Sequence, residues 1–125
     1  MTQIGPREAA KVLIVDDDFA LRDALCAALE GEGLAVAAVS NGQEALDYLR
    51  SGARPSLVLL DLMMPIMNGW EFRAQQRQDP DLADIPVIVL SAFARSGDEE
   101  LRGIGQFLRK PFQLVDLLAA VRAYC

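Results

Sequence analysis

The 125-residue chain contains no histidine and two cysteines, Cys26 and Cys125. Without histidine, neither a Ser-His-Asp nor a Cys-His catalytic group can form, and a zinc site of the usual Cys/His spacing is excluded. Two cysteines are too few for a disulfide framework, so we expect free thiols and a location in the reducing cytoplasm. No apolar run approaches the ~18 residues of a transmembrane helix, and residues 1–10 lack the apolar core of a signal peptide.

Positive charge is also scarce in this sequence. Twelve Lys and Arg residues oppose 18 Asp and Glu residues, which gives a formal net charge of −6. This charge argues against direct nucleic-acid binding through a basic surface and is compatible with a basic partner or a cation. The hydrophobic content of 52% is typical of a globular chain with one core. We expect an N-terminal tail over residues 1–9 and a single domain over residues 10–125.

Short apolar segments alternate with amphipathic segments along the chain. The pattern predicts strands over residues 11–16, 34–40, 56–61, 85–92 and within 105–112. It predicts helices over residues 19–33, 42–50, 69–78 and 113–125, whereas residues 93–105 carry no clear pattern. The alternation indicates an α/β fold of the flavodoxin-like, doubly wound class. We expect a five-stranded parallel sheet in the order 2-1-3-4-5 with helices on both faces.

Helical spacing also predicts which side chains face the core. In the first predicted helix these are Leu21, Ala24, Leu25, Ala28 and Leu29. In the second and last they are Ala45, Leu46, Leu49, Leu114, Leu117, Leu118 and Val121. Asp18 and Asn41 precede helices and are typical N-cap residues. We interpret Asp18 as a helix cap and assign it no other role.

Polar side chains follow four of the predicted strands. Asp16 and Asp17 end the first, Asp61 the third, Ser91 the fourth and Lys110 the fifth. Because the carboxyl ends of parallel strands share one edge of the sheet, these side chains should meet there. Gathered carboxylates repel one another unless a cation lies among them, and ligands that are all oxygen favour Mg²⁺, with Mn²⁺ as an alternative.

An aspartate beside such a cation can attack phosphorus as a nucleophile. Lys110 and Ser91 would then hold phosphoryl oxygens, one by charge and the other by a hydrogen bond. The residues therefore indicate Mg²⁺-assisted phosphoryl transfer onto an aspartate.

Four segments, VLIVDDD, LVLLDLMMPIMNG, VIVLSA and FLRKPF, occur in this order. Together they resemble the receiver domain of response regulators in two-component signalling, over about residues 10–124. The resemblance implies that Asp61 is the phosphoacceptor and that Asp17 binds the metal directly. It also implies that Asp16 holds metal-bound water and that the backbone carbonyl of Met63 is a further ligand.

The same resemblance assigns the remaining positions. Ser91 matches the switch hydroxyl and Phe107 the switch aromatic residue, while Ala92 matches the small residue that admits the phosphoryl group. Lys110 matches the phosphate-binding lysine, and Lys110–Pro111 matches a peptide bond that is typically cis. The implied phosphodonor is a sensor histidine kinase or a phosphotransfer protein, and the implied output is contact with a downstream protein. We expect no enzymatic activity beyond the domain's own phosphorylation and dephosphorylation.

The chain departs from the family pattern between Ser91 and Lys110. These residues are 19 positions apart, which is shorter than usual by roughly one helical turn. The shortfall, together with Gly103 and Gly105, predicts a short or frayed fourth helix around residues 98–103. In receivers this helix, the fifth strand and the last helix form the usual dimer and output surface. The shortfall therefore puts that dimer in doubt.

Other interpretations of the sequence remain open. A Mg²⁺-dependent hydrolase with an aspartyl-phosphate intermediate would need a second acid two residues after the nucleophile, where this chain has Met63. A non-phosphorylated pseudo-receiver would not need the full set of acid, hydroxyl and lysine. A flavin-binding module would need a phosphate-binding loop after the first strand. Both a stand-alone regulator and a piece of a larger protein are compatible with the sequence.

Overall fold

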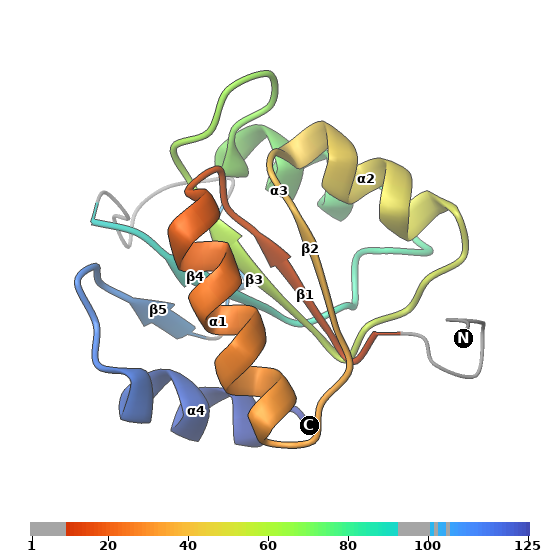
Figure 1. The fold of residues 1–125 in the computed structure, drawn as a ribbon. Coiled ribbons are helices and arrows are strands. Elements are labelled where there is room, and N and C mark those ends of the chain that lie inside the picture. Colours follow the sequence, from red (N-terminus) through yellow and green to blue (C-terminus); the bar gives the residue numbers. More distant parts are fainter. Residues whose placement is uncertain (1–9, 93–100, 102, 105) are drawn as a thin grey trace.

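The structure, a computed structural model, describes residues 10–92, 101, 103–104 and 106–125. Within these residues, strands and helices alternate as far as β4, and the next described elements are β5 and α4 (Figure 1). The strands are β1 (Val12–Val15), β2 (Val36–Val39), β3 (Leu57–Asp61), β4 (Val87–Leu90) and β5 (Gln106–Leu108). The helices are α1 (Phe19–Gly31), α2 (Gly42–Arg50), α3 (Gly69–Gln78) and α4 (Leu114–Arg122). The predicted tail over residues 1–9 and most of the helix predicted around 98–103 lie outside the described residues.

The five strands form one parallel sheet in the order β2-β1-β3-β4-β5. This order and the flavodoxin-like class are those predicted from the sequence. In the register of the sheet, Val15 lies opposite Leu60 and Asp61 lies opposite Leu90. The carboxyl ends of the central strands are therefore level, and the residues that follow them share one edge of the sheet.

Helices cover both faces of this sheet, and the side chains of each strand alternate between the two faces (Figure 1). The helices α2 and α3 pack on one face, where the core includes Leu13, Val15, Leu46, Leu49, Leu60 and Phe72. The helices α1 and α4 pack on the other face, where the core includes Ile14, Leu25, Leu29, Leu59, Leu117 and Val121. Because β1, β3 and β4 are buried on both sides, they need the continuous apolar sequence that predicted them.

Polar side chains start the three helices that follow β1, β2 and β3. The N-caps are Asp18 for α1, Asn41 for α2 and Asn68 for α3. Asp18 accepts a hydrogen bond from the Leu21 N–H at 3.1 Å, as its sequence position predicts. Asn68 and Glu71 form a capping box, which satisfies two backbone N–H groups reciprocally. These caps fix where each helix leaves the sheet edge that carries the acids.

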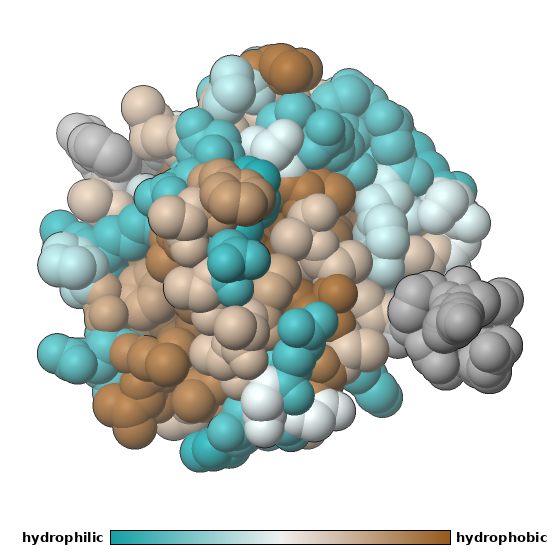
Figure 2. Space-filling view, viewed as in Figure 1, coloured by the Kyte–Doolittle hydropathy of each residue, from teal (hydrophilic) through white to brown (hydrophobic). Residues whose placement is uncertain are grey.

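Two of the predicted core positions are wrong. Ala24 of α1 is exposed, and Leu114 of α4 is 46% exposed. Leu114 is the first residue of α4 and lies before the turn that packs on the sheet, whereas Ala120 near its end is buried. Figure 2 shows hydrophobic surface over the start of α4, where Leu114 and Val115 lie.

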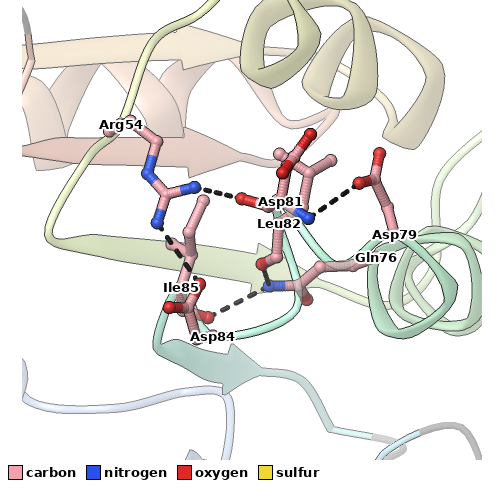
Figure 3. A network of polar contacts seen from close by, with 7 residues as sticks. All are labelled: Arg54, Gln76, Asp79, Asp81, Leu82, Asp84 and Ile85. Atoms are coloured by element: carbon pink, nitrogen blue, oxygen red, sulfur yellow. Dashed lines mark hydrogen bonds and ion pairs between the residues drawn. The ribbon is translucent and has the colours of Figure 1, made fainter.

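A second polar cluster holds the connection from α3 to β4 (Figure 3). We call it the α3–β4 network, and it comprises Arg54, Gln76, Asp79, Asp81, Leu82, Asp84 and Ile85. The buried Gln76 amide donates to the carbonyl oxygens of Leu82 and Ile85, both at 3.0 Å. Arg54 forms an ion pair with Asp84 at 3.2 Å. The network therefore fixes a loop that lies before β4 and far in sequence from Arg54.

The helices of the described residues are all too short or too polar to cross a lipid bilayer.

Candidate functional site

Three carboxylates meet at the carboxyl edge of the sheet. One oxygen each from Asp16, Asp17 and Asp61 lies within 4.8 Å of the others. Asp16 directly follows β1 and is 0% exposed, and Asp61 ends β3 and is 6% exposed, whereas Asp17 is exposed. The structure thus brings together the three acids that strand direction predicted would meet. We call them the edge carboxylates.

Lys110 reaches the edge carboxylates from the end of β5. Its Nζ lies 2.8 Å from Asp16 Oδ2 and 3.4 Å from Asp61 Oδ1. The peptide bond from Lys110 to Pro111 is cis, as the resemblance implies. The predicted lysine therefore bridges two of the acids from a position 94 residues away from Asp16.

Burial and charge shift the pKa values of this group in a defined way. Burial, and then the neighbouring Asp16 charge, raise the pKa of Asp61 above its ordinary value, although Lys110 acts in the opposite direction. Burial alone would lower the pKa of Lys110, but its hydrogen bond and charge interactions with Asp16 and Asp61 outweigh burial and raise it. Lys110 is therefore held as a cation, while Asp61 is harder to ionise than an exposed aspartate.

The backbone around Asp16 is fixed by several contacts. The Asp18 N–H donates to Asp16 Oδ1 at 2.9 Å, and the Asp16 N–H donates to the Val39 carbonyl at 3.1 Å. Arg22 of α1 donates from Nη1 to the Asp16 carbonyl oxygen at 2.8 Å. From the sequence we assigned Arg22 no role. Arg22 lies one helical turn after the Asp18 cap, and this spacing could have predicted that its side chain reaches back to the end of β1.

Ser91 lies at the same edge, directly after β4. It is buried, and its N–H donates to the Leu108 carbonyl of β5 at 3.1 Å. Phe107 lies on β5 opposite Val89 and is 39% exposed. Ala92 follows Ser91 and is exposed. Ser91 thus places a hydroxyl at the edge of the sheet that carries the acids, and Phe107 places an aromatic ring on the neighbouring edge strand β5. The switch roles assigned to them stay predictions.

The loop between β3 and α3 borders the edge carboxylates. Met63, whose carbonyl is the predicted fourth metal ligand, is half exposed in this loop. Ile66 has a φ of 70°, a left-handed conformation that a β-branched residue adopts at a cost in free energy. Its side chain is 82% exposed. Neither side chain is buried over Asp61, and the role of the Met63 carbonyl stays a prediction.

Two glycines hold that loop against its surroundings. A Cβ on Gly69 would lie 2.4 Å from the carbonyl oxygen of Asp61, so no side chain fits there. A Cβ on Gly42 would lie 2.9 Å from the carbonyl oxygen of Met67, which accepts a hydrogen bond from the Gly42 N–H at 2.9 Å. The first residues of α2 and α3 therefore lie so close to the backbone of the β3–α3 segment that no side chain fits between them.

The donor set of the edge carboxylates fits a hard divalent cation. It consists entirely of oxygen atoms, it is partly buried, and one of its members, Asp17, faces solvent. Mg²⁺ takes one or two carboxylates and keeps several waters, which matches an open site of this kind. With Lys110 alongside, the arrangement can bind a phosphoryl group close to a buried carboxylate.

Comparison with curated proteins supports a signalling function. The response regulator MprA of Mycolicibacterium vanbaalenii is 41% identical over 117 residues, which are 90% of this chain and 49% of that protein. The DNA-binding response regulator MtrA of Mycobacterium tuberculosis is 39% identical over 116 residues, with the same coverage of this chain and 49% of its own length. The chain spans about half the length of the curated relatives it matches.

Solved structures resemble the whole described fold. The signal receiver domain of a histidine kinase from Syntrophus aciditrophicus has a TM-score of 0.82 and 34% identity, covering 93% of this chain and 89% of its own. The response regulator TrrA of Thermotoga maritima, solved with Mg²⁺–BeF, has a TM-score of 0.80 and 30% identity, covering 91% and 97%. A family model described as the response regulator receiver domain matches residues 12–122. The chain therefore belongs to the receiver domain family of two-component response regulators.

Proposed function

We propose that this receiver domain accepts a phosphoryl group on Asp61 from a phosphohistidine of a sensor histidine kinase or phosphotransfer protein. The proposed Mg²⁺ ligands are Asp17, Asp61 and the Met63 carbonyl, with Asp16 holding metal-bound water. The observation that carries the proposal is the position of Lys110 Nζ, 2.8 Å from Asp16 and 3.4 Å from Asp61, beside three clustered carboxylates. The Mg²⁺–BeF complex of the similar regulator TrrA supports it.

In the proposed reaction, a carboxylate oxygen of Asp61 attacks phosphorus while the bond from phosphorus to the imidazole nitrogen breaks. The electron pair of that bond leaves with the imidazole, and an acyl phosphate forms on Asp61. Lys110 binds one phosphoryl oxygen by its charge, and Ser91 binds another through its hydroxyl. Mg²⁺, when bound, offsets negative charge on the carboxylates and the phosphoryl group.

The chain's own residues prepare Asp61 for this step. Burial raises the pKa of Asp61, so a positive charge nearby is needed to favour the nucleophilic carboxylate form. Lys110 supplies one such charge, and its contact with Asp16 holds its ammonium group in place. Asp18 and Asn68 cap α1 and α3, the helices that follow the strands β1 and β3, at whose ends Asp16 and Asp61 lie.

Phosphorylation would then change the protein-interaction surface at β4 and β5. Ser91 lies immediately after β4, and its N–H is bonded to the Leu108 carbonyl of β5, next to Phe107. Inward movement of the Ser91 hydroxyl would therefore act directly on the strand that carries the half-exposed Phe107 ring. The output would be a shift between two conformations that a downstream protein distinguishes.

The remaining assignments belong to the same proposal. We assign the domain to residues 10–125 and to the cytoplasm, where the thiols of Cys26 and Cys125 would stay reduced. The name of MtrA says that it binds DNA, but this chain spans half the length of that protein. The expectation that this acidic chain itself makes no direct contact with nucleic acid therefore stays a prediction, as does the altered dimer surface.

The test is incubation of the protein with acetyl phosphate and Mg²⁺, followed by intact mass measurement. We expect the mass of one phosphoryl group, lost in Asp61→Asn and lost when EDTA removes the metal. Asp84→Asn removes the same charge as Asp61→Asn, but from the α3–β4 network, and it should be phosphorylated like the wild type. No adduct from either acetyl phosphate or a phosphorylated kinase would overturn the proposal. Continuous hydrolysis of a phosphomonoester would favour the hydrolase instead.

A further inference from the structure

Arg22 reaches from α1 back to the end of β1. Its Nη1 donates to the carbonyl oxygen of Asp16 at 2.8 Å. That oxygen belongs to the planar peptide unit that joins Asp16 to Asp17, so its direction also fixes the direction of the Asp17 N–H. Arg22 therefore acts on the backbone between two of the edge carboxylates without contacting their side chains.

The backbone matters most for Asp17. The Asp16 carboxylate is buried and held by hydrogen bonds from the Asp18 N–H at 2.9 Å and from Lys110 at 2.8 Å. Asp17 is exposed, and none of the described residues donates a hydrogen bond to its carboxylate. Its carboxylate nevertheless lies within 4.8 Å of those of Asp16 and Asp61. The position of the Asp17 carboxylate among the edge carboxylates therefore depends on the Asp16–Asp17 peptide bond, whose carbonyl oxygen accepts the hydrogen bond from Arg22.

The side chain of Phe19 supports the guanidinium of Arg22. The Arg22 Cζ lies 5.5 Å from the centroid of the Phe19 ring, one helical turn away on α1. Phe19 is 71% exposed, so the ring covers the guanidinium rather than packing into the core. A cation over an aromatic face is attracted by the quadrupole of the ring. This contact therefore favours the guanidinium position from which Arg22 reaches the Asp16 carbonyl.

We propose that Arg22 is a positioning residue of the metal site, which holds the Asp16–Asp17 peptide so that the Asp17 carboxylate stays beside Asp16 and Asp61. The inference rests on the proposed function, because it concerns the same Mg²⁺ site. An arginine suits this role because its planar guanidinium can bind the carbonyl and stack on Phe19 at the same time. A lysine would keep the charge and lose the stacking geometry.

The first measurement is Mg²⁺ affinity by isothermal titration of the wild type, Arg22→Met, Arg22→Lys and Arg122→Met. Arg122, the last residue of α4, pairs with Glu32 at 2.8 Å at the opposite end of α1 from the site, so Arg122→Met removes an equal charge away from the edge carboxylates. We expect Arg22→Met to weaken binding about tenfold, as loss of a residue supporting a metal ligand commonly does. Arg22→Lys should weaken it about threefold, and Arg122→Met should leave it unchanged.

The second measurement uses the metal-free protein. The amide resonance of Asp17 in a ¹H–¹⁵N spectrum should move in Arg22→Met and stay in place in Arg122→Met. Phosphorylation by acetyl phosphate should need about tenfold more Mg²⁺ for half-maximal rate in Arg22→Met, while the rate at saturating Mg²⁺ should match the wild type. A merely destabilised domain would lose the saturated rate as well.

The outcomes separate the two proposals. If the wild type binds no Mg²⁺, the proposed metal site and the role of Arg22 both fall. If the wild type binds Mg²⁺ and Arg22→Met matches Arg122→Met in affinity and in the Asp17 resonance, the role of Arg22 alone is overturned. If circular dichroism shows that Arg22→Met is unfolded, the Mg²⁺ affinity of Arg22→Lys becomes the test. An affinity of Arg22→Lys equal to that of the wild type would overturn the positioning role of Arg22.

Discussion

Two clusters of acids in this domain differ in how their charge is offset. In the α3–β4 network, Asp84 has Arg54 at 3.2 Å (Figure 3). Asp79 has Arg50, a residue of α2 outside the network, at 3.8 Å. Among the described residues, the edge carboxylates have one direct cationic partner, Lys110, which contacts Asp16 and Asp61. Asp79 and Asp84 each have an arginine of their own, whereas Asp16 and Asp61 share one lysine and Asp17 has no ion pair among the described residues.

The difference shows how charge can be arranged for structure or for binding. A matched acid gains little from a further cation, because its partner already offsets its charge. Clustered acids with too few partners repel one another, and a divalent cation relieves that repulsion. The α3–β4 network accordingly holds a loop, whereas the edge carboxylates form the proposed site for a bound ion. Variants matched between the two clusters test this comparison.

The largest effect should come from Asp17→Ala. It removes the exposed member of the edge carboxylates, and we expect Mg²⁺ affinity to fall about hundredfold, or about 2.7 kcal/mol. Isothermal titration measures this, with Asp84→Ala as the matched removal of an acid from the α3–β4 network. Asp18→Ala should bind Mg²⁺ normally and lose about 1 kcal/mol of stability as a helix cap. Equal loss of affinity in all three variants would make the comparison untenable.

Gln76→Ala should have the second largest effect, and on stability rather than binding. The change leaves two buried carbonyls, those of Leu82 and Ile85, without their side-chain donor and removes the acceptor for Arg73. We expect a loss of about 2–3 kcal/mol in urea unfolding. The exposed neighbour Gln75 provides the control, since Gln75→Ala should change stability by less than about 0.5 kcal/mol. Altered Mg²⁺ affinity in Gln76→Ala would contradict the separation of the two clusters.

Asp61→Asn should stabilise the metal-free protein at neutral pH by about 1 kcal/mol. The folded state raises the pKa of Asp61, so it favours the protonated acid, and the stability from that preference is lost as pH rises. A neutral asparagine avoids this loss. The gain should vanish below about pH 4, where the wild-type carboxyl is protonated in both states.

Thermal unfolding from pH 4 to 8, with EDTA present, measures the difference for Asp61→Asn. Added Mg²⁺ should reverse its sign, because the ion stabilises the wild type by binding. A variant that is less stable than the wild type at pH 7 without metal would show that the edge carboxylates carry no net repulsion.

The smallest effect should come from the outer ion pair of the α3–β4 network. Arg54 and Asp84 are both more than half exposed, so Asp84→Ala should cost no more than about 0.5 kcal/mol. Salt should reduce even that cost, since exposed pairs are screened. Urea unfolding at low and high salt provides the measurement. A loss above about 1 kcal/mol would place this pair among the main supports of the loop.

The fold and the meeting of the acids could be predicted because both depend on local pattern. Strands buried on two faces require continuous apolar sequence, and parallel strands bring their ends together whatever lies between them. The predicted strands extended up to two residues too far at either end, as in residues 34–40 against β2 (Val36–Val39). Leu34 explains the excess, because it packs against the core without belonging to the strand.

The remaining features depend on contacts between distant segments, which pattern does not encode. The sequence of α3 is polar at Arg73 and Gln76, yet both side chains are buried. Their burial depends on Gln76 donating to carbonyls of the loop that follows α3. Arg22 is similar, because its role follows from the reach of one side chain to the end of another element.

The close approach of Gly69 to the Asp61 carbonyl bears on how a mutational scan of this domain should be interpreted. Any side chain at Gly69 must displace the β3 backbone at Asp61, and any side chain at Gly42 must displace Met67 in the loop beside it. Both positions would score among the most intolerant in the chain, alongside Asp61 and Lys110. Sensitivity alone would therefore mark them as reactive centres, although neither glycine has a side chain with which to react.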